Sequence, residues 1–200
     1  KRDLARKFAH DRAAYTRGKG ELIAHMQERA WRWAGAALLV FDLEATCWEG
    51  GQSIERMETI EIGAVRLDAQ LKAAGEHSAF VRPRDQPRLT DFCVALTSIR
   101  PADVDSAPPF PQALRAFADW TGKGAFRLAS WGDYDLAQLK EDSRRHGISF
   151  PAALESYIDL REAYSRVRGV PLCPMAEALK REGLEATGRA HRAIDDARNA

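Results

Sequence analysis

The sequence has few cysteines and no long apolar run. Its 200 residues include three cysteines, Cys47, Cys93 and Cys173, and no two of them form a CxxC pair. This scarcity excludes a disulfide-rich scaffold and a zinc ribbon, and it favours a reducing compartment, the cytoplasm. The longest apolar run, residues 36–41, is far shorter than the roughly 20 residues of a membrane-spanning helix, so we expect no membrane partner. A Gly-x4-Gly-Lys-Ser/Thr loop is also absent, which argues against a kinase or a nucleotide-triphosphate switch.

Neither sign of charge dominates the whole chain, but the distribution of charge is uneven. The sequence has 30 Lys and Arg against 29 Asp and Glu, for a formal net charge of +1. Residues 1–36 carry nine basic and four acidic side chains, which leaves residues 37–200 with a charge of −4. We therefore divide the chain into a basic helical N-terminal arm, residues 1–36, and one domain, residues 37–200. The charge of the arm suggests an anionic partner, whereas its apolar stripe favours a helix docked on the domain.

Hydrophobic periodicity predicts an α/β domain in residues 37–200. Continuous or alternating apolar residues predict strands near 37–41, 59–67, 76–82, 126–131 and 157–160. Helical spacing predicts helices near 90–97, 111–120, 133–146, 161–167, 174–182 and 193–200. Three consecutive strands with short connections indicate an antiparallel meander. The helix–strand–helix order that follows indicates a mixed five-stranded sheet flanked by helices.

Two carboxylates follow the first predicted strand. Asp42 and Glu44 are separated by one residue, so their side chains point to the same face of the strand. Crowded carboxylates repel each other, whereas a hard divalent cation such as Mg²⁺ binds oxygen ligands and holds them together. Taken alone, the pair is explained at least as well by a polar strand end that meets solvent.

Two further acidic clusters favour the metal interpretation. Asp133 and Asp135 follow the fourth predicted strand, at the sheet edge where open α/β sheets bind ligands, although either residue could instead stabilise a helix N-terminus. His191, Asp195 and Asp196 lie close together near residue 200. Carboxylates for metal ions and a titratable base for water are the groups that a two-metal phosphodiester site needs.

These clusters and their neighbouring segments resemble the DEDDh 3′→5′ exonucleases, which have the ribonuclease H-like fold. The resemblance covers residues 38–200, whereas residues 1–36 have no recognised counterpart. It is carried by DLEATCWE (42–49), ETIEIGA (58–64), FVRP (80–83), LTDFC (89–93), LTSI (96–99), SWG (130–132) and HRAIDDARN (191–199). The DxEATC and SWGxYD segments together are similar to the exoribonuclease branch, which trims histone-mRNA ends, small interfering RNAs and ribosomal RNA ends.

The resemblance implies five catalytic residues and two Mg²⁺ or Mn²⁺ ions. The metal carboxylates would be Asp42, Glu44, Asp135 and Asp196. His191 would be the general base, a role suited to a group that titrates near neutral pH. Helical spacing from His191 alone favours Asp195 over Asp196, because residues four apart share a helix face. The family instead has the histidine in a loop before the helix, which selects Asp196; its pattern also selects Asp135 over Asp133.

The implied reaction is metal-dependent hydrolysis of single-stranded RNA from the 3′ end, with release of nucleoside 5′-monophosphates. The backbone at Ala45 and Thr46 would approach the terminal sugar. Leu96 and Thr97 match a family segment that contacts the terminal nucleotide. Tyr134 would stack on a base, as aromatic residues do in single-strand sites. Trp131, Cys47 and Cys93 are expected to be packing residues.

Two other functions are also compatible with these residues. A DNA 3′→5′ exonuclease, such as a proofreading module, would use the same fold and the same catalytic set. A non-catalytic nucleic-acid-binding or regulatory module would keep the fold without turnover, although all five catalytic positions are filled. The residues do not identify a protein partner.

Overall fold

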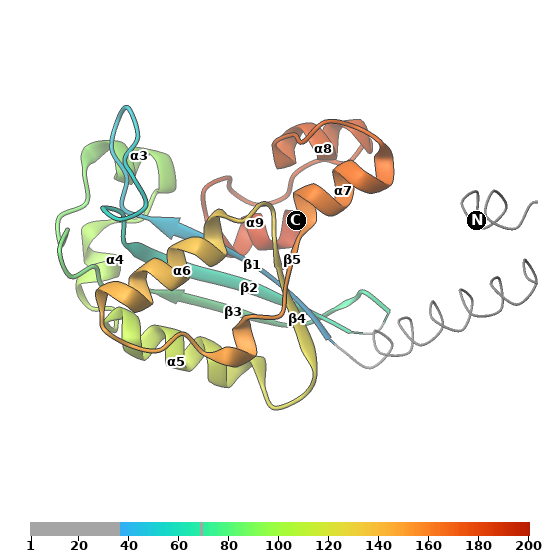
Figure 1. Ribbon diagram of the computed structural model, residues 1–200. Coiled ribbons are helices and arrows are strands. Elements are labelled where there is room, and N and C mark those ends of the chain that lie inside the picture. The colour runs from blue at the N-terminus through green and yellow to red at the C-terminus, as the bar shows by residue number, and fades with distance from the viewer. Residues whose placement is uncertain (1–36, 69) are drawn as a thin grey trace, which may run out of the picture. The chain divides into compact units, whose positions relative to one another are not determined.

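One mixed sheet forms the centre of the described domain. The computed structural model describes residues 37–68 and 70–200, so the predicted arm lies outside the described residues. The strands are β1 (Ala37–Ala45), β2 (Thr59–Leu67), β3 (Ala73–Phe80), β4 (Phe126–Ser130) and β5 (Tyr157–Asp159). They lie in the order β3-β2-β1-β4-β5 (Figure 1). β1, β2 and β3 form an antiparallel meander, and β4 and β5 run parallel to β1, which confirms the predicted mixed sheet.

The helices are short and follow the predicted order with one addition. They are α3 (Asp91–Thr97), α4 (Pro101–Asp105), α5 (Phe110–Thr121), α6 (Tyr134–Arg145), α7 (Leu160–Arg168), α8 (Met175–Arg181) and α9 (Ala193–Asn199). The sequence pattern misses α4, because five residues are too few to show a helical period. β1 runs further than predicted, to Ala45, so Asp42 and Glu44 lie inside the strand. None of the helices among the described residues is long and apolar enough to cross a membrane.

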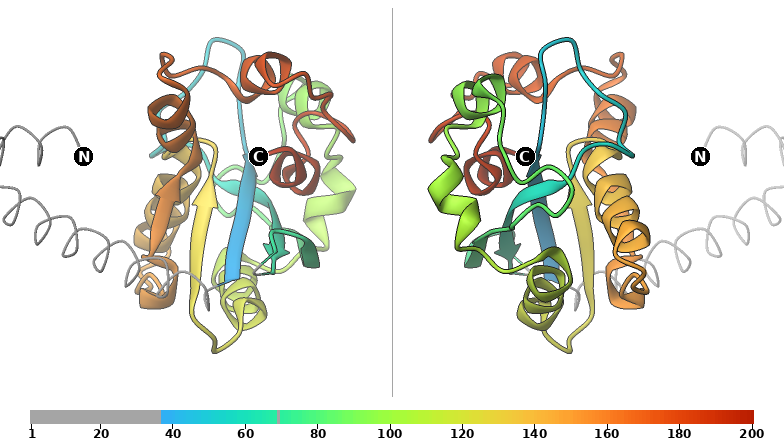
Figure 2. Two further views of the ribbon diagram at one scale, coloured as in Figure 1. Left: turned by 90° about the vertical axis from the view of Figure 1, so that its right-hand side faces the viewer. Right: turned by 90° about the vertical axis from the view of Figure 1, so that its left-hand side faces the viewer.

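The two faces of the sheet carry different side chains along β1. Because side chains alternate on a strand, Leu39, Phe41 and Leu43 point to one face, while Asp42 and Glu44 point to the other. The three apolar residues belong to the main hydrophobic core, together with residues of β2, α5 and α6. The carboxylate face is covered by α9, which packs on β1 and β2. Figure 2 shows α5 and α9 separated by the sheet.

Close packing of α9 on β2 depends on Gly63. This residue pairs with Asp42 across β1 and β2, so it lies on the face that α9 covers. A Cβ atom at this position would overlap the backbone of Ala193 and Ile194. The absence of a side chain therefore lets the first turn of α9 lie directly on the strand, beside Asp42.

Polar side chains of α6 hold the segment that leads into β2. Asp142 is 1% exposed and accepts hydrogen bonds from the backbone N and the Oγ1 of Thr59, at 2.9 and 2.7 Å. Arg145 forms an ion pair with Asp142, and its Nη1 donates to the carbonyl oxygen of Met57 at 2.7 Å. The Nε2 of Gln138 donates to the same carbonyl at 3.0 Å. These bonds fix residues 57–59 against α6, where they form one wall of the pocket described below.

Candidate active site

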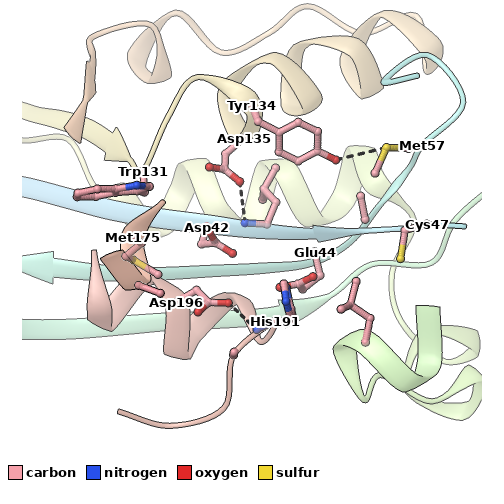
Figure 3. Close-up of a pocket in the computed structure, with 15 residues that line it drawn as sticks. Asp42, Glu44, Cys47, Met57, Trp131, Tyr134, Asp135, Met175, His191 and Asp196 are labelled. Atoms are coloured by element: carbon pink, nitrogen blue, oxygen red, sulfur yellow. Dashed lines mark hydrogen bonds between the residues drawn. The ribbon is translucent and has the colours of Figure 1, made fainter. Parts of the chain in front are cut away.

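A pocket of about 480 Å³ opens where β1 ends. It brings together residues from β1, α3, α6, α8 and α9 that are far apart in the sequence (Figure 3). All five predicted catalytic residues line it, as do three of the five predicted substrate residues. The lining residues are Asp42, Leu43, Glu44, Ala45, Cys47, Met57, Leu96, Trp131, Tyr134, Asp135, Met175, Ala176, Ala190, His191 and Asp196.

The turn between β4 and α6 brings Asp135 to β1. β4 ends at Ser130, so the backbone N–H of Leu43 has no partner from that strand. The Oδ1 of Asp135, in the first turn of α6, accepts a hydrogen bond from this N–H at 3.2 Å (Figure 3). Asp133 is not a lining residue; its side chain is 85% exposed and lies 3.8 Å from the guanidinium of Arg161. The geometry therefore selects Asp135 over Asp133 for the pocket.

The loop before α9 brings His191 and Asp196 to the opposite side. His191 has a φ of 61°, in the left-handed region, and its backbone N–H donates to Oδ2 of Asp196 at 2.8 Å. His191 is thus outside the helix, and the helical spacing that favoured Asp195 does not apply. Asp195 instead accepts hydrogen bonds from the N–H of Arg189, at 2.9 Å, and from Nη1 of Arg198, at 2.6 Å. It lies outside the pocket and holds the loop.

The ligand atoms in the pocket are close enough to share a cation. One ligand atom each from Glu44, His191 and Asp196 lies within 4.8 Å of the others. Asp42 and Asp135 face the same space (Figure 3). Among the described residues that line the pocket, none is a lysine or an arginine. Carboxylate oxygens and an imidazole without a cationic side chain are a donor set that fits hard divalent metal ions.

Burial and mutual repulsion raise the pKa values of these carboxyl groups. Burial is the largest cause of the shift of Asp42, whose pKa lies well above its usual range, and the charges of Asp135 and Glu44 add to it. Burial and the charge of Asp196 raise the pKa of Glu44 to about 8. Burial raises the pKa of Asp135 to about 7, and burial also raises that of Asp196. The site is thus costly to ionise without a cation, which supports the metal interpretation.

An apolar wall stands beside the carboxylates. Tyr134 is 40% exposed, and its hydroxyl donates to Oε1 of Gln138 at 3.4 Å and contacts the sulfur of Met57 at 3.7 Å (Figure 3). Leu96 of α3 lines the pocket as predicted. Such a wall suits the planar face of a base.

Trp131 also lines the pocket, on the other side of Asp135 from Tyr134 (Figure 3), and it is only partly buried, so its predicted place in the core is wrong. Its Nε1 donates to the carbonyl oxygen of Cys173 at 3.1 Å, and its ring lies 5.7 Å from that of Tyr164. These partners belong to the segment between β5 and α9, which is far from Trp131 in the sequence. Local sequence therefore held no signal for this placement. The same is true of Met57, Met175 and Ala190, which also line the pocket.

Two predicted substrate residues are not in the pocket lining. Thr46 is 2% exposed, and its Oγ1 accepts a hydrogen bond from the N–H of Glu58 at 3.0 Å. Thr97 is fully buried; its Oγ1 donates to the carbonyl of Cys93 at 2.9 Å and accepts from the N–H of Ile99 at 3.1 Å. Both hydroxyl groups are used inside the domain. The approach of their backbone to a nucleotide stays a prediction.

The thiols of Cys47 and Cys93 are partners of each other. Cys47 is half-buried in the pocket lining, and Cys93 is buried on α3. A hydrogen bond between the two thiols is the largest cause of a lowered pKa at Cys93, about 7, and of a raised pKa at Cys47. Packing was predicted for both residues, but their pairing was not, because 46 positions of sequence separate two thiols that the fold brings together.

Comparisons with known proteins identify the family of the chain. The family model described as an exonuclease matches residues 39–200. The ERI1 exoribonuclease 2 of Homo sapiens is 31% identical; the match covers 81% of this chain and 27% of that protein, so the chain spans about a quarter of its length. The solved nuclease domain of 3′hExo, a DEDDh family member bound to rAMP, is 29% identical with a TM-score of 0.77, over 82% of this chain and 88% of that one. A 3′-exonuclease solved in 3′-end-specific recognition of a histone mRNA stem-loop is 28% identical with a TM-score of 0.79, over 82% and 78%.

Proposed function

The chain belongs to the exonuclease family whose model matches residues 39–200, and from this membership and the pocket we propose that it is a metal-dependent 3′→5′ exoribonuclease. The proposed reaction is hydrolysis of the last phosphodiester of single-stranded RNA to a nucleoside 5′-monophosphate. One observation carries the proposal. Carboxylates from three separate segments and one histidine meet in a single pocket beside an apolar wall.

Four carboxylates are available to hold Mg²⁺ or Mn²⁺, in a two-metal arrangement. They are Asp42, Glu44, Asp135 and Asp196. Bound divalent cations supply Lewis-acid chemistry: they lower the pKa of water and offset charge on the phosphate. The chain contributes a rigid, buried ligand set, because Asp42 and Glu44 lie where β1 pairs with β2 on one edge and the N–H of Leu43 is held by Asp135 on the other. Such a set loses little conformational entropy when it binds ions.

His191 has the exposure and the place of a general base. Its ring lies in the pocket next to Glu44 and Asp196, while the residue itself is exposed and can exchange protons with solvent. In the proposed step, a water oxygen attacks the phosphorus atom and the bond from phosphorus to the 3′ oxygen breaks. An imidazole nitrogen of His191 takes the proton of the attacking water. The departing 3′ oxygen takes a proton from solvent to become a hydroxyl group, and the imidazolium returns its proton to solvent.

The apolar wall is the proposed site of the terminal base. Tyr134 and Leu96 line the pocket from α6 and α3. Stacking on such side chains binds single strands with little dependence on sequence. RNA is favoured over DNA because the relatives named above are an exoribonuclease and a nuclease domain bound to rAMP. The backbone at Ala45 and Thr46 remains our candidate for contact with the terminal sugar.

Degradation of a 5′-labelled single-stranded RNA tests the proposal. We expect Mg²⁺ or Mn²⁺ to support a ladder that shortens from the 3′ end, and a chelator or Asp42→Ala to abolish it. Asp133→Asn is the matched control, because this exposed carboxylate lies near Asp135 but outside the pocket. Degradation of DNA but not RNA of the same sequence would favour the proofreading-like alternative. Intact substrate under every condition, from folded protein, would favour the non-catalytic alternative.

A further inference from the structure

His191 adopts a backbone conformation that is uncommon for residues other than glycine. Its φ of 61° is in the left-handed region. Such a conformation persists where surrounding contacts over-determine it. The contacts that hold residues 187–193 therefore decide where the imidazole lies.

Most hydrogen bonds of this loop stay within the loop and α9. The N–H of Thr187 donates to Asn199 at 2.9 Å, that of Arg189 to Asp195 at 2.9 Å, and that of His191 to Asp196 at 2.8 Å. These bonds make the loop and the helix one unit. They do not set the position of this unit on the sheet, where Asp42 and Glu44 lie.

One buried carboxylate ties the unit to the sheet immediately after His191. Glu61 of β2 is fully buried and pairs with Glu44 across the two strands. Its oxygens accept hydrogen bonds from Nε and Nη2 of Arg192, at 3.1 and 2.8 Å, and from the N–H of Ala193 at 3.1 Å. Among the described residues, the other hydrogen bonds between this unit and the sheet join Arg198, at the far end of α9, to Glu76 of β3.

The geometry points to Glu61 and Arg192 as positioning residues: they fix the position of the imidazole of His191, the general base. This inference rests on the proposed function. Glu61 lies beside Glu44, and its charge contributes to the raised pKa values of Asp42 and Glu44, so it is an unfavourable residue for the metal-free site. Arg192 neutralises it through a two-point contact that lysine cannot reproduce. The first turn of α9 also has no side-chain cap of its own at Arg192, and Glu61 satisfies the N–H of Ala193 in its place.

A double-mutant cycle with His191 tests whether Glu61 affects the rate through the position of the imidazole or only through the stability of the protein. Glu61→Gln keeps the shape of the side chain and removes its charge. We expect the single-turnover rate on RNA to fall about 10- to 100-fold, because small displacements of a catalytic group have effects of this size. The KM for RNA should stay within about twofold, since Glu61 does not line the pocket. In a His191→Ala background the same substitution should change the rate by less than about twofold, because its effect acts through the imidazole.

Variants of the basic partner provide the controls. Arg192→Lys should retain more of the rate than Arg192→Gln, because lysine restores the charge but only one contact. Arg198→Gln is the matched control: Arg198 joins the other end of α9 to Glu76 of β3 and also contacts Asp195, which keeps its bond to the N–H of Arg189. Its loss should leave the rate within about twofold. If Glu61→Gln does not fold, Arg192→Lys and Arg192→Gln are compared alone in both backgrounds.

Amide hydrogen exchange of the metal-free protein supplies a readout that does not depend on turnover. Glu61→Gln should speed exchange at residues 189–193 at least about tenfold while β1 and β2 keep their protection. Unchanged exchange there, or an equal loss of rate with and without His191, overturns the inference. A wild-type protein that degrades neither RNA nor DNA overturns the proposed function instead. In that case the exchange data still decide whether Glu61 holds the loop.

Discussion

Asp42, Glu44 and Asp135 lie on one side of the pocket, and His191 and Asp196 lie on the other. The first side is formed by β1, with a strand on each side of it, and by the first turn of α6. The second side is formed by an exposed loop and the seven-residue helix α9. The first side holds buried carboxylates whose pKa values are raised, whereas the histidine on the second side is open to solvent.

This difference fits two different chemical tasks. Metal ligands gain from burial, because a low dielectric strengthens their attraction to a cation and keeps them in place. A general base must release its proton after each turnover, which requires access to water. The buried carboxylates should therefore cost stability in the metal-free protein, and the exposed imidazole of His191 should not.

Asp135→Asn tests the first half of this comparison and has the largest expected effect. The activity should fall at least about 1000-fold, because a metal ligand is lost. The metal-free protein should become more stable by about 1–3 kcal/mol at pH 8, because the amide resembles the neutral form that burial favours and can still accept from the N–H of Leu43. Single-turnover kinetics and urea unfolding in chelator measure the two effects. A loss of stability would show that Asp135 is mainly a structural residue.

His191→Asn tests the second half. Asparagine tolerates the left-handed backbone of this position, so the loop should keep its shape. The rate should fall about 100- to 1000-fold, which is the usual contribution of a general base. The free energy of unfolding should change by less than about 0.5 kcal/mol, because the side chain is exposed. If His191→Asn changed the free energy of unfolding as much as Asp135→Asn does, the two sides of the pocket would not differ in the way described.

The pH dependence of stability tests the same contrast without activity. The pKa of Glu44 is raised to about 8, above its usual 4.5, so the folded state binds more protons than the unfolded state between these values. The free energy of unfolding of the metal-free protein should therefore fall as the pH rises from 5 to 8, by about 2–4 kcal/mol. Glu44→Gln should flatten this profile, and added Mg²⁺ should oppose the fall by binding the ionised form. A profile that rises over this range would contradict the raised pKa.

The buried side was also the easier one to predict from the sequence. Alternation along a strand is enough to place Asp42 and Glu44 on one face, and the strand-to-helix boundary places Asp135 near them. The antiparallel meander of the first three strands followed from their short connections, and the mixed sheet followed from the order of the elements. These features depend on neighbours in the sequence, so local patterns carried them.

The placement of His191 and Asp196 depends on contacts between residues that are distant in the sequence. Helical spacing alone favoured Asp195, because the sequence does not show that the loop turns back on the first turn of α9. Glu61 was part of an ordinary alternating strand, and its partner Arg192 is 131 residues away. Trp131 met its partners only in the folded chain. Family resemblance chose Asp196 correctly for the pocket, but it did not identify what holds the loop.

Gly63→Ala weakens the contact between the two sides of the pocket. An added methyl group would overlap the backbone of Ala193, so α9 must move away from β2. We expect a loss of about 1–3 kcal/mol in the free energy of unfolding. The rate should also fall, because the same movement carries His191 and Asp196 away from Asp42. Urea unfolding and single-turnover kinetics on the same preparation measure both.

Gly75→Ala is the matched control for this substitution. Gly75 lies on β3, and a Cβ atom there would meet nothing within 4 Å. It should leave the rate unchanged and should change the free energy of unfolding by less than about 0.5 kcal/mol. If Gly63→Ala lowered stability but left the rate intact, α9 could shift without moving the base. The position of His191 would then depend on its own loop and on the bonds of Arg192 to Glu61, and not on the packing of α9 against Gly63.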